Sequence, residues 1–164
     1  MTKFTALLTP ENIRQGVICS SKKIAFEIAS DILAKQAGIE DFGEIECFEY
    51  LFNREKLGST AIGNGIAMPR ARLPKGEKVL AVFLQLSTPI DYEAADKREV
   101  DLILAIIIPE QLCQTYTPIL VELSEKLKDK TLDKQLRSAQ SAEEIWQIFQ
   151  QLDNKDPEDL DLPK

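Results

Sequence analysis

Two nearly continuous apolar runs dominate the middle of the chain. "VLAVFLQL" covers residues 79–86, and "VDLILAIIIP" covers residues 100–109, where Pro109 ends the run. Such runs, without alternating polar residues, are typical of strands buried on both faces. We therefore predict two central strands, joined by the polar and turn-rich segment 87–99.

The segments before these runs have the spacing of amphipathic helices. Apolar residues recur every three to four positions between 21 and 37, after a pair of serines suited to an N-cap and before Gly38, which can end the helix. A second amphipathic segment around residues 45–52 follows. It places Arg54 at the end of a helix.

The C-terminal part of the chain is predicted to be helical. Thr117 and Pro118 have the pattern of a cap followed by a first-turn proline, ahead of a leucine repeat at 120–127. Ser141 and Glu144 have the spacing of a capping box ahead of another apolar repeat. Strands and helices thus mix in one α/β domain, which we place at 1–152.

Charge and length exclude several classes of protein. The 164 residues include 44% hydrophobic positions, enough for one domain, and the formal net charge is -7. Such an acidic chain is not expected to bind nucleic acid or an anionic membrane. No membrane-spanning run or signal peptide is visible, so we expect a cytoplasmic protein without membrane insertion. The acidic residues 153–164 are predicted to be a disordered tail.

Three cysteines at 19, 47 and 113 are an odd number without metal-ligand spacing. We predict reduced thiols, with no metal site and no cofactor.

A glycine-dense loop, "GSTAIGNGIAMPRARLP" at 58–74, is the main candidate for chemistry. Four of the seven glycines, Gly58, Gly63, Gly65 and Gly76, lie in or just after it. Glycines let backbone N–H groups approach an anion, but neither nucleotide-binding motif is complete here. A glycine-rich hairpin with short strands around 61–62 and 66–68 is the alternative interpretation, and the spacing alone leaves both open.

Four segments together resemble one protein family. "NREKLGSTAIGNGIAMPRARLP", "CSSKKIAFEIASDILAKQ", "VFLQLSTPIDYEAADKREVDLILAIIIP" and "LKDKTLDKQLRSAQSAEEIWQI" are similar to parts of the nitrogen-regulatory enzyme IIA proteins of the bacterial phosphotransferase system. The likeness covers about residues 5–152. It implies a mixed β-sheet flanked by α-helices, the EIIA mannitol/nitrogen-type fold, and a phosphoryl group taken from a small phosphocarrier protein. Regulated transporters or sensor kinases are the further partners that it implies.

The chain departs from this family at the acceptor itself, because it contains no histidine. In the family pattern a histidine follows the loop proline, where this chain has Arg70. The place of a second family histidine falls on Pro118, and Tyr116 fills a further position where some members have histidine. Arg54 matches the family arginine near the phosphohistidine. A guanidinium stays protonated and has no lone pair to offer, so Arg70 cannot replace a histidine as nucleophile.

These departures suggest a regulatory protein that docks on partners in a permanently unphosphorylated condition. Two alternatives remain open. Phosphotransfer would need another nucleophile, for which Cys113, Ser59 and Thr60 are the candidates. A small-anion sensor would use Arg54, Arg70 and the amides of Gly63, Asn64 and Gly65. The oligomeric state and the identity of the partner are not indicated by the sequence.

Overall fold

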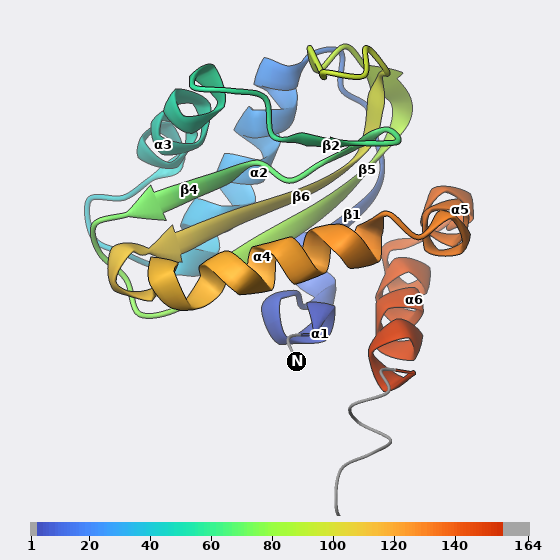
Figure 1. Cartoon of the computed structure of the whole chain (residues 1–164). Coiled ribbons are helices and arrows are strands. Elements are labelled where there is room, and N and C mark those ends of the chain that lie inside the picture. The colour runs from blue at the N-terminus through green and yellow to red at the C-terminus, as the bar shows by residue number, and fades with distance from the viewer. Residues whose placement is uncertain (1–2, 156–164) are drawn as a thin grey trace, which may run out of the picture.

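The two apolar runs form the centre of a six-stranded mixed sheet in the computed structural model, which describes residues 3–155 (Figure 1). β5 (Leu80–Ile90) and β6 (Val100–Pro109) pair antiparallel, and both predicted central strands are confirmed. β5 extends further than predicted, through residues 87–90. The connecting segment therefore begins only after Ile90, which is itself buried and paired with Val100.

Shorter strands complete the sheet on both sides. β1 (Ile13–Val17) runs parallel to β5. On the other side, β3 (Ile66–Ala67) and β4 (Arg70–Leu73) lie one after the other along β6, both parallel to it. β2 (Ala61–Gly63) pairs antiparallel with β3, so the predicted strands in the glycine loop are confirmed as a hairpin.

Helices cover both faces of the sheet, so the alternate residues of β5 and β6 enter two separate cores. One core contains Val82, Leu84 and Ile103 with α2 (Lys22–Ala37) and α3 (Glu44–Lys56). The other contains Phe83, Leu102 and Leu104 with α1 (Phe4–Leu7), α4 (Cys113–Leu127), α5 (Lys130–Ser138) and α6 (Ala142–Asn154). Short 3-10 turns occupy Pro10–Asn12 and Glu110–Leu112. This arrangement explains why the central runs are apolar on both sides.

The predicted ends of α2 are confirmed by its caps. The Ser21 hydroxyl accepts a hydrogen bond from the N–H of Ile24 at 3.2 Å, and Gly38 ends the helix in the left-handed region at φ 58°. α6 likewise starts after Ser141, whose hydroxyl accepts from the N–H of Glu144. The predicted capping box is only half formed, because the Glu144 carboxylate accepts from the N–H of Gln140 rather than of Ser141.

The prediction for the start of α4 is wrong. The 3-10 turn Glu110–Leu112 leads directly into the helix, which begins at Cys113, so Pro118 lies inside it rather than in its first turn. The hydroxyl of Thr117 donates to the carbonyl of Cys113 at 2.9 Å and does not cap a helix. The spacing of the leucines shows that a helix is present, but it does not show that the helix begins earlier, directly after a 3-10 turn.

The predicted tail also begins too early. Asp153 belongs to α6 and is buried, and its carboxylate accepts hydrogen bonds from the N–H groups of Phe4 and Thr5 and from the Thr5 hydroxyl. It therefore caps the start of α1. Residues 156–164 of the predicted tail lie outside the described residues.

The cysteines follow the expectation of reduced thiols. Cys19 and Cys47 are buried, Cys113 is half-buried, and all three are free. Within residues 3–155 no helix is long and apolar enough to cross a membrane.

Candidate functional site

Arg70, the residue at the expected acceptor position, opens β4. It pairs with Ile106 in the sheet register, and the N–H of Ile106 donates to the carbonyl of Pro69 at 2.9 Å. The side chain is half-buried, and its buried Nε has no hydrogen-bond partner. Burial lowers the pKa of Arg70, as does the charge of Arg54, while Glu55 and Tyr92 act in the opposite direction. The strand thus holds a partly desolvated cation.

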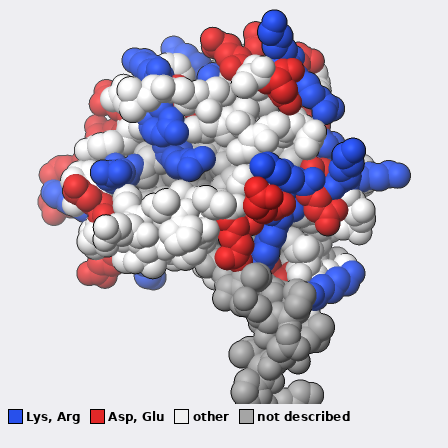
Figure 2. Space-filling model, in the orientation of Figure 1, with Lys and Arg blue, Asp and Glu red and all other residues white. Residues whose placement is uncertain are grey.

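Arg54 lies in the last turn of α3, as the sequence indicates. Its Nη1 donates to the carbonyl of Gly58 at 3.0 Å and so ties the helix end to the start of the glycine loop. Its charge is close enough to affect Arg70, so the structure brings these two predicted residues together. In Figure 2, Lys and Arg side chains gather left of centre without acidic side chains between them. Two guanidinium groups on one patch favour a negatively charged partner.

A buried polar network lies beside Arg70, and sequence reasoning missed it. Glu55, only 6% exposed, accepts hydrogen bonds from Lys22 Nζ at 3.1 Å, from the N–H of Thr60 at 3.1 Å and from the Thr60 hydroxyl at 2.5 Å. Lys22 Nζ also lies 4.6 Å from the centre of the Tyr92 ring, whose hydroxyl is 2.8 Å from Thr60 Oγ1. The network joins three separate segments, which contain Lys22, Glu55 with Thr60, and Tyr92, so no local spacing signals it as a whole.

This network gives Arg70 no hydrogen-bonded counter-ion, because Tyr92 is neutral and Glu55 is bonded to other groups. Burial raises the pKa of Tyr92 well above its ordinary range, and the neighbouring Glu55 carboxylate adds to the effect. Tyr92 is therefore a neutral hydrogen-bonding group. Glu55 is already shared between Lys22 and Thr60, and it makes no hydrogen bond or ion pair to Arg70 within residues 3–155.

The turn Gly63–Gly65 does not join the arginine patch. The carbonyl of Gly65 accepts from the N–H groups of Asp101 and Leu102, whereas Arg70 faces Ile106. At about 3.3 Å per residue, these places lie roughly 15 Å apart along β6. The predicted amides of Gly63, Asn64 and Gly65 are thus not directed at the same anion as Arg70.

The turn Gly63–Gly65 has a structural role instead, because side chains from other segments hold it in place. The N–H of Asn64 donates to the Asp96 carboxylate at 3.3 Å, and Arg98 Nη1 donates to Asn64 Oδ1 at 3.2 Å. Arg137 Nη2 donates to the carbonyl of Asn64 at 2.5 Å, while its Nε lies 3.0 Å from both carboxylate oxygens of Asp101. Positive φ angles at all three turn residues explain the glycines, as in the hairpin interpretation.

The remaining candidate positions are poorly placed for chemistry. Pro118 is exposed on α4, and Tyr116 is half-buried against the core. Thr60 is 3% exposed, and Ser59 Oγ accepts from the N–H of Ala61 at 3.3 Å. The Cys113 thiol faces the carbonyls of Ile108 and Pro109 at 3.9 and 3.6 Å.

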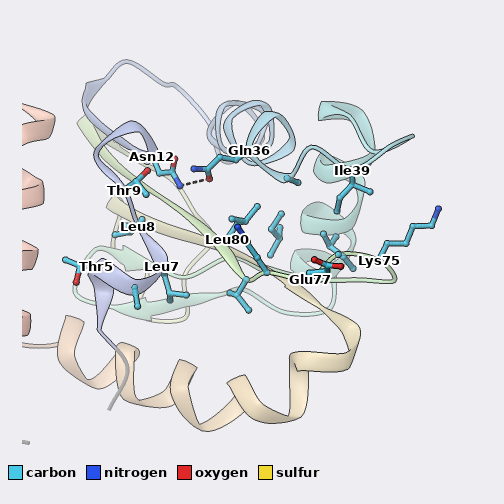
Figure 3. Close-up of a pocket in the computed structure, with 17 residues that line it drawn as sticks. Thr5, Leu7, Leu8, Thr9, Asn12, Gln36, Ile39, Lys75, Glu77 and Leu80 are labelled. Atoms are coloured by element: carbon cyan, nitrogen blue, oxygen red, sulfur yellow. Dashed lines mark hydrogen bonds between the residues drawn. The ribbon is translucent and has the colours of Figure 1, made fainter.

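A cavity of about 590 Å³ lies elsewhere, between α1, the end of α2 and the loop that joins β4 to β5 (Figure 3). Apolar side chains such as Leu7, Leu8 and Leu80 line much of it, and Asn12 Nδ2 donates to Gln36 Oε1 at 2.5 Å there. None of the predicted site residues lines this cavity. It is therefore separate from the arginine patch.

Comparison with known proteins decides the family. Residues 6–152 match the family described as phosphoenolpyruvate-dependent sugar phosphotransferase system, EIIA 2. This chain belongs to that family. A nitrogen regulatory protein homolog of Haemophilus influenzae is 54% identical over 94% of both chains, and the nitrogen regulatory protein of Escherichia coli K12 is 40% identical over 90% of this chain and 89% of its own.

Solved structures of this EIIA family confirm the fold. IIA-Ntr of Neisseria meningitidis superimposes with a TM-score of 0.82 at 30% identity, over 88% of this chain and 97% of that one. The IIA mannitol protein of Escherichia coli, at 23% identity, shares the fold with a TM-score of 0.72 over 87% of this chain and 98% of its own. The predicted mixed sheet flanked by helices, and the resemblance to nitrogen-regulatory IIA proteins, are therefore correct.

Proposed function

We propose that this EIIA protein is a regulator that docks on partner proteins through the Arg54–Arg70 patch without receiving a phosphoryl group at residue 70. The observation that carries the proposal is the half-buried guanidinium of Arg70 at the start of β4, whose buried Nε has no hydrogen-bond partner. The names of its nitrogen-regulatory relatives support a regulatory role. In this proposal the docking surface around Arg70 is always unphosphorylated.

The chemistry of residue 70 supports this single state. A phosphoryl acceptor needs a lone pair, and a guanidinium offers only N–H donors. Even with the pKa lowered by burial and by Arg54, an arginine stays charged near neutral pH. Arg70 thus places positive charge where a phosphohistidine would place negative charge, and repulsion of an acidic partner by phosphorylation does not arise.

The partners proposed are proteins with an acidic docking surface, among them a regulated transporter or sensor kinase, or the phosphocarrier of the phosphotransferase system. The patch has two arginines, which form bidentate hydrogen bonds with carboxylates. Phosphotransfer on Thr60, Ser59 or Cys113 is less well supported, because Thr60 is buried and already bonded to Glu55 and Tyr92.

The experiment is a capture of partners from the cytoplasm of the source organism, with and without phosphoenolpyruvate and the phosphocarrier. We expect the wild-type chain to capture the same proteins in both conditions, and Arg70→Glu to lose them. Arg72→Glu, on an exposed neighbour in β4, is the matched control for charge and should capture them normally. Capture by the wild type that depends on phosphoenolpyruvate contradicts the proposal.

A second candidate function, binding of a small anion at the same patch, is favoured by the buried Nε of Arg70, which has no hydrogen-bond partner within residues 3–155. Phosphate or sulfate would bind the two guanidinium groups and raise the melting temperature by mass action. Arg54→Met should reduce that rise. Lys75→Ala, an exposed cation on the loop between β4 and β5, is the control and should leave the anion-dependent rise unchanged.

A further inference from the structure

A second basic hollow, of about 470 Å³, lies beside α5 and the turn Gly63–Gly65. Its lining is rich in cations for a protein with a formal net charge of -7. The residues with charged or amide side chains that line it are Asn64, Arg98, Lys130, Asp133, Lys134 and Arg137. Four cations thus face one hollow that contains a single acid.

Two exposed lysines concentrate positive charge at this hollow. Lys130 is the first residue of α5 and Lys134 lies one turn later, so they share a face of the helix. Neither lysine side chain makes a hydrogen bond or ion pair within residues 3–155. Lys130 lies in the first turn of the helix, where the helix dipole favours negative rather than positive charge. A bound anion would relieve both effects.

Asp133 forms part of the wall between these cations. It is only 3% exposed, and its buried Oδ1 has no hydrogen-bond partner. Burial raises the pKa of Asp133 to about 6; Arg137 opposes this, whereas Asp129 and Asp101 add to it. Lys130, Lys134 and Arg98 line the same hollow. Protonation of Asp133 therefore removes the negative charge that lies in the wall of the hollow itself.

We propose that this hollow binds a small molecule that carries a diphosphate group, held by Lys130, Lys134 and Arg98. Arg137 remains paired with Asp101 and holds the turn in place. Two phosphate centres suit two lysines one helical turn apart, and the volume lies in the range of small-molecule sites. Single phosphate ions should bind more weakly, because they reach fewer of the cations at once.

The test is a titration of the ¹⁵N-labelled full chain with inorganic pyrophosphate and with ADP at 0.15 M salt, followed by amide NMR shifts. We expect shifts at 64, 98 and 130–138, and at least roughly tenfold weaker binding by the double variant Lys130→Ala with Lys134→Ala. Lys75→Ala with Lys78→Ala removes the same charge at the Figure 3 cavity and should bind normally. Equal weakening by both double variants, or shifts confined to residues 54–70, would overturn the proposal.

A second measurement tests the contribution of Asp133 separately. Asp133→Asn should bind pyrophosphate more tightly than the wild type at pH 7.5, where the wild-type carboxylate is ionised. The two proteins should approach the same affinity at pH 5, since Asp133 is then largely protonated. Comparison at each pH cancels the titration of pyrophosphate itself. A ratio of affinities that does not change with pH would show that Asp133 does not face the bound anion.

Discussion

Arg137 and Arg70 lie near different parts of β6, and they differ in whether their Nε groups have hydrogen-bond partners. At the turn Gly63–Gly65, Arg137 lies between the Asp101 carboxylate and the carbonyl of Asn64. At the start of β4, Arg70 has a buried Nε without a partner.

This difference suggests a structural role for Arg137 and a binding role for Arg70. Arg137 satisfies the turn and is part of the fold, whereas the buried Nε of Arg70 has no hydrogen-bond partner and its charge lies beside that of Arg54. Unsatisfied polar groups in a folded protein are costly, and they are often retained for binding. The following predictions test this contrast, starting with the largest expected effect.

The largest loss of stability is expected for Glu55→Gln, in the network beside Arg70. It leaves the Lys22 ammonium without its carboxylate and weakens the acceptor for Thr60. Breaking a buried ion pair costs about 3 kcal/mol of unfolding free energy. Urea denaturation measures it, and Glu49→Gln on the exposed side of α3 is the control. A loss below about 1 kcal/mol would show that the network is not stabilising.

The next effect is expected for Gly65→Ala in the paired region. Gly65 has φ 80°, and an added Cβ would lie 2.7 Å from Arg137 Nη2 and 3.2 Å from the carbonyl of Glu99. Such strain costs about 2 kcal/mol. Gly58→Ala, where a Cβ meets nothing within 4 Å and φ is not positive, should change stability little. Equal effects at both glycines would contradict the structural role of the turn.

A smaller effect, of opposite sign, is expected for Asp133→Asn. The raised pKa, about 6 against an ordinary value of 3.8, means that ionised Asp133 costs stability, and that this cost grows as pH rises from about 4 to 6. The variant should therefore be about 1 kcal/mol more stable than the wild type at pH 7.5, with no advantage at pH 4. Denaturation at both pH values measures this. An advantage that is the same at both would contradict it.

The smallest effect should come from Arg70 itself. Arg70→Met removes a half-buried cation whose Nε has no hydrogen-bond partner and keeps most of the apolar contact, so the unfolding free energy should change by less than about 0.5 kcal/mol. Arg137→Met removes charge-assisted hydrogen bonds and should cost about 1 to 2 kcal/mol. Similar losses for both variants would remove the distinction between the two regions.

The sequence predicts much of the fold, because its signals there are local. The apolar runs at 79–86 and 100–109 and the caps at Ser21, Gly38 and Ser141 all lie where the structure has them. The start of α4 was not predictable from its leucines, since the preceding 3-10 turn continues into the helix.

The candidate site was predicted only in part. Arg54 and Arg70 were expected together and lie together, as the family resemblance implies. The glycine turn is near Arg70 in sequence but about 15 Å away along β6, because β3 separates them. Asp133, Arg137 and Glu55 acquire their roles through contacts between distant segments, and no motif marks them.

The most direct test of the central claim is an intact-mass measurement after incubation with phosphoenolpyruvate, the upstream enzyme and the phosphocarrier. We expect no phosphoryl adduct on the wild-type chain, because Arg70 has no lone pair to accept it. Arg70→His, and more so Arg70→His with Pro118→His, should take up one phosphoryl group, since each restores an imidazole at an expected family position. A phosphoryl adduct on the wild-type chain would contradict the proposal of a regulator that is never phosphorylated.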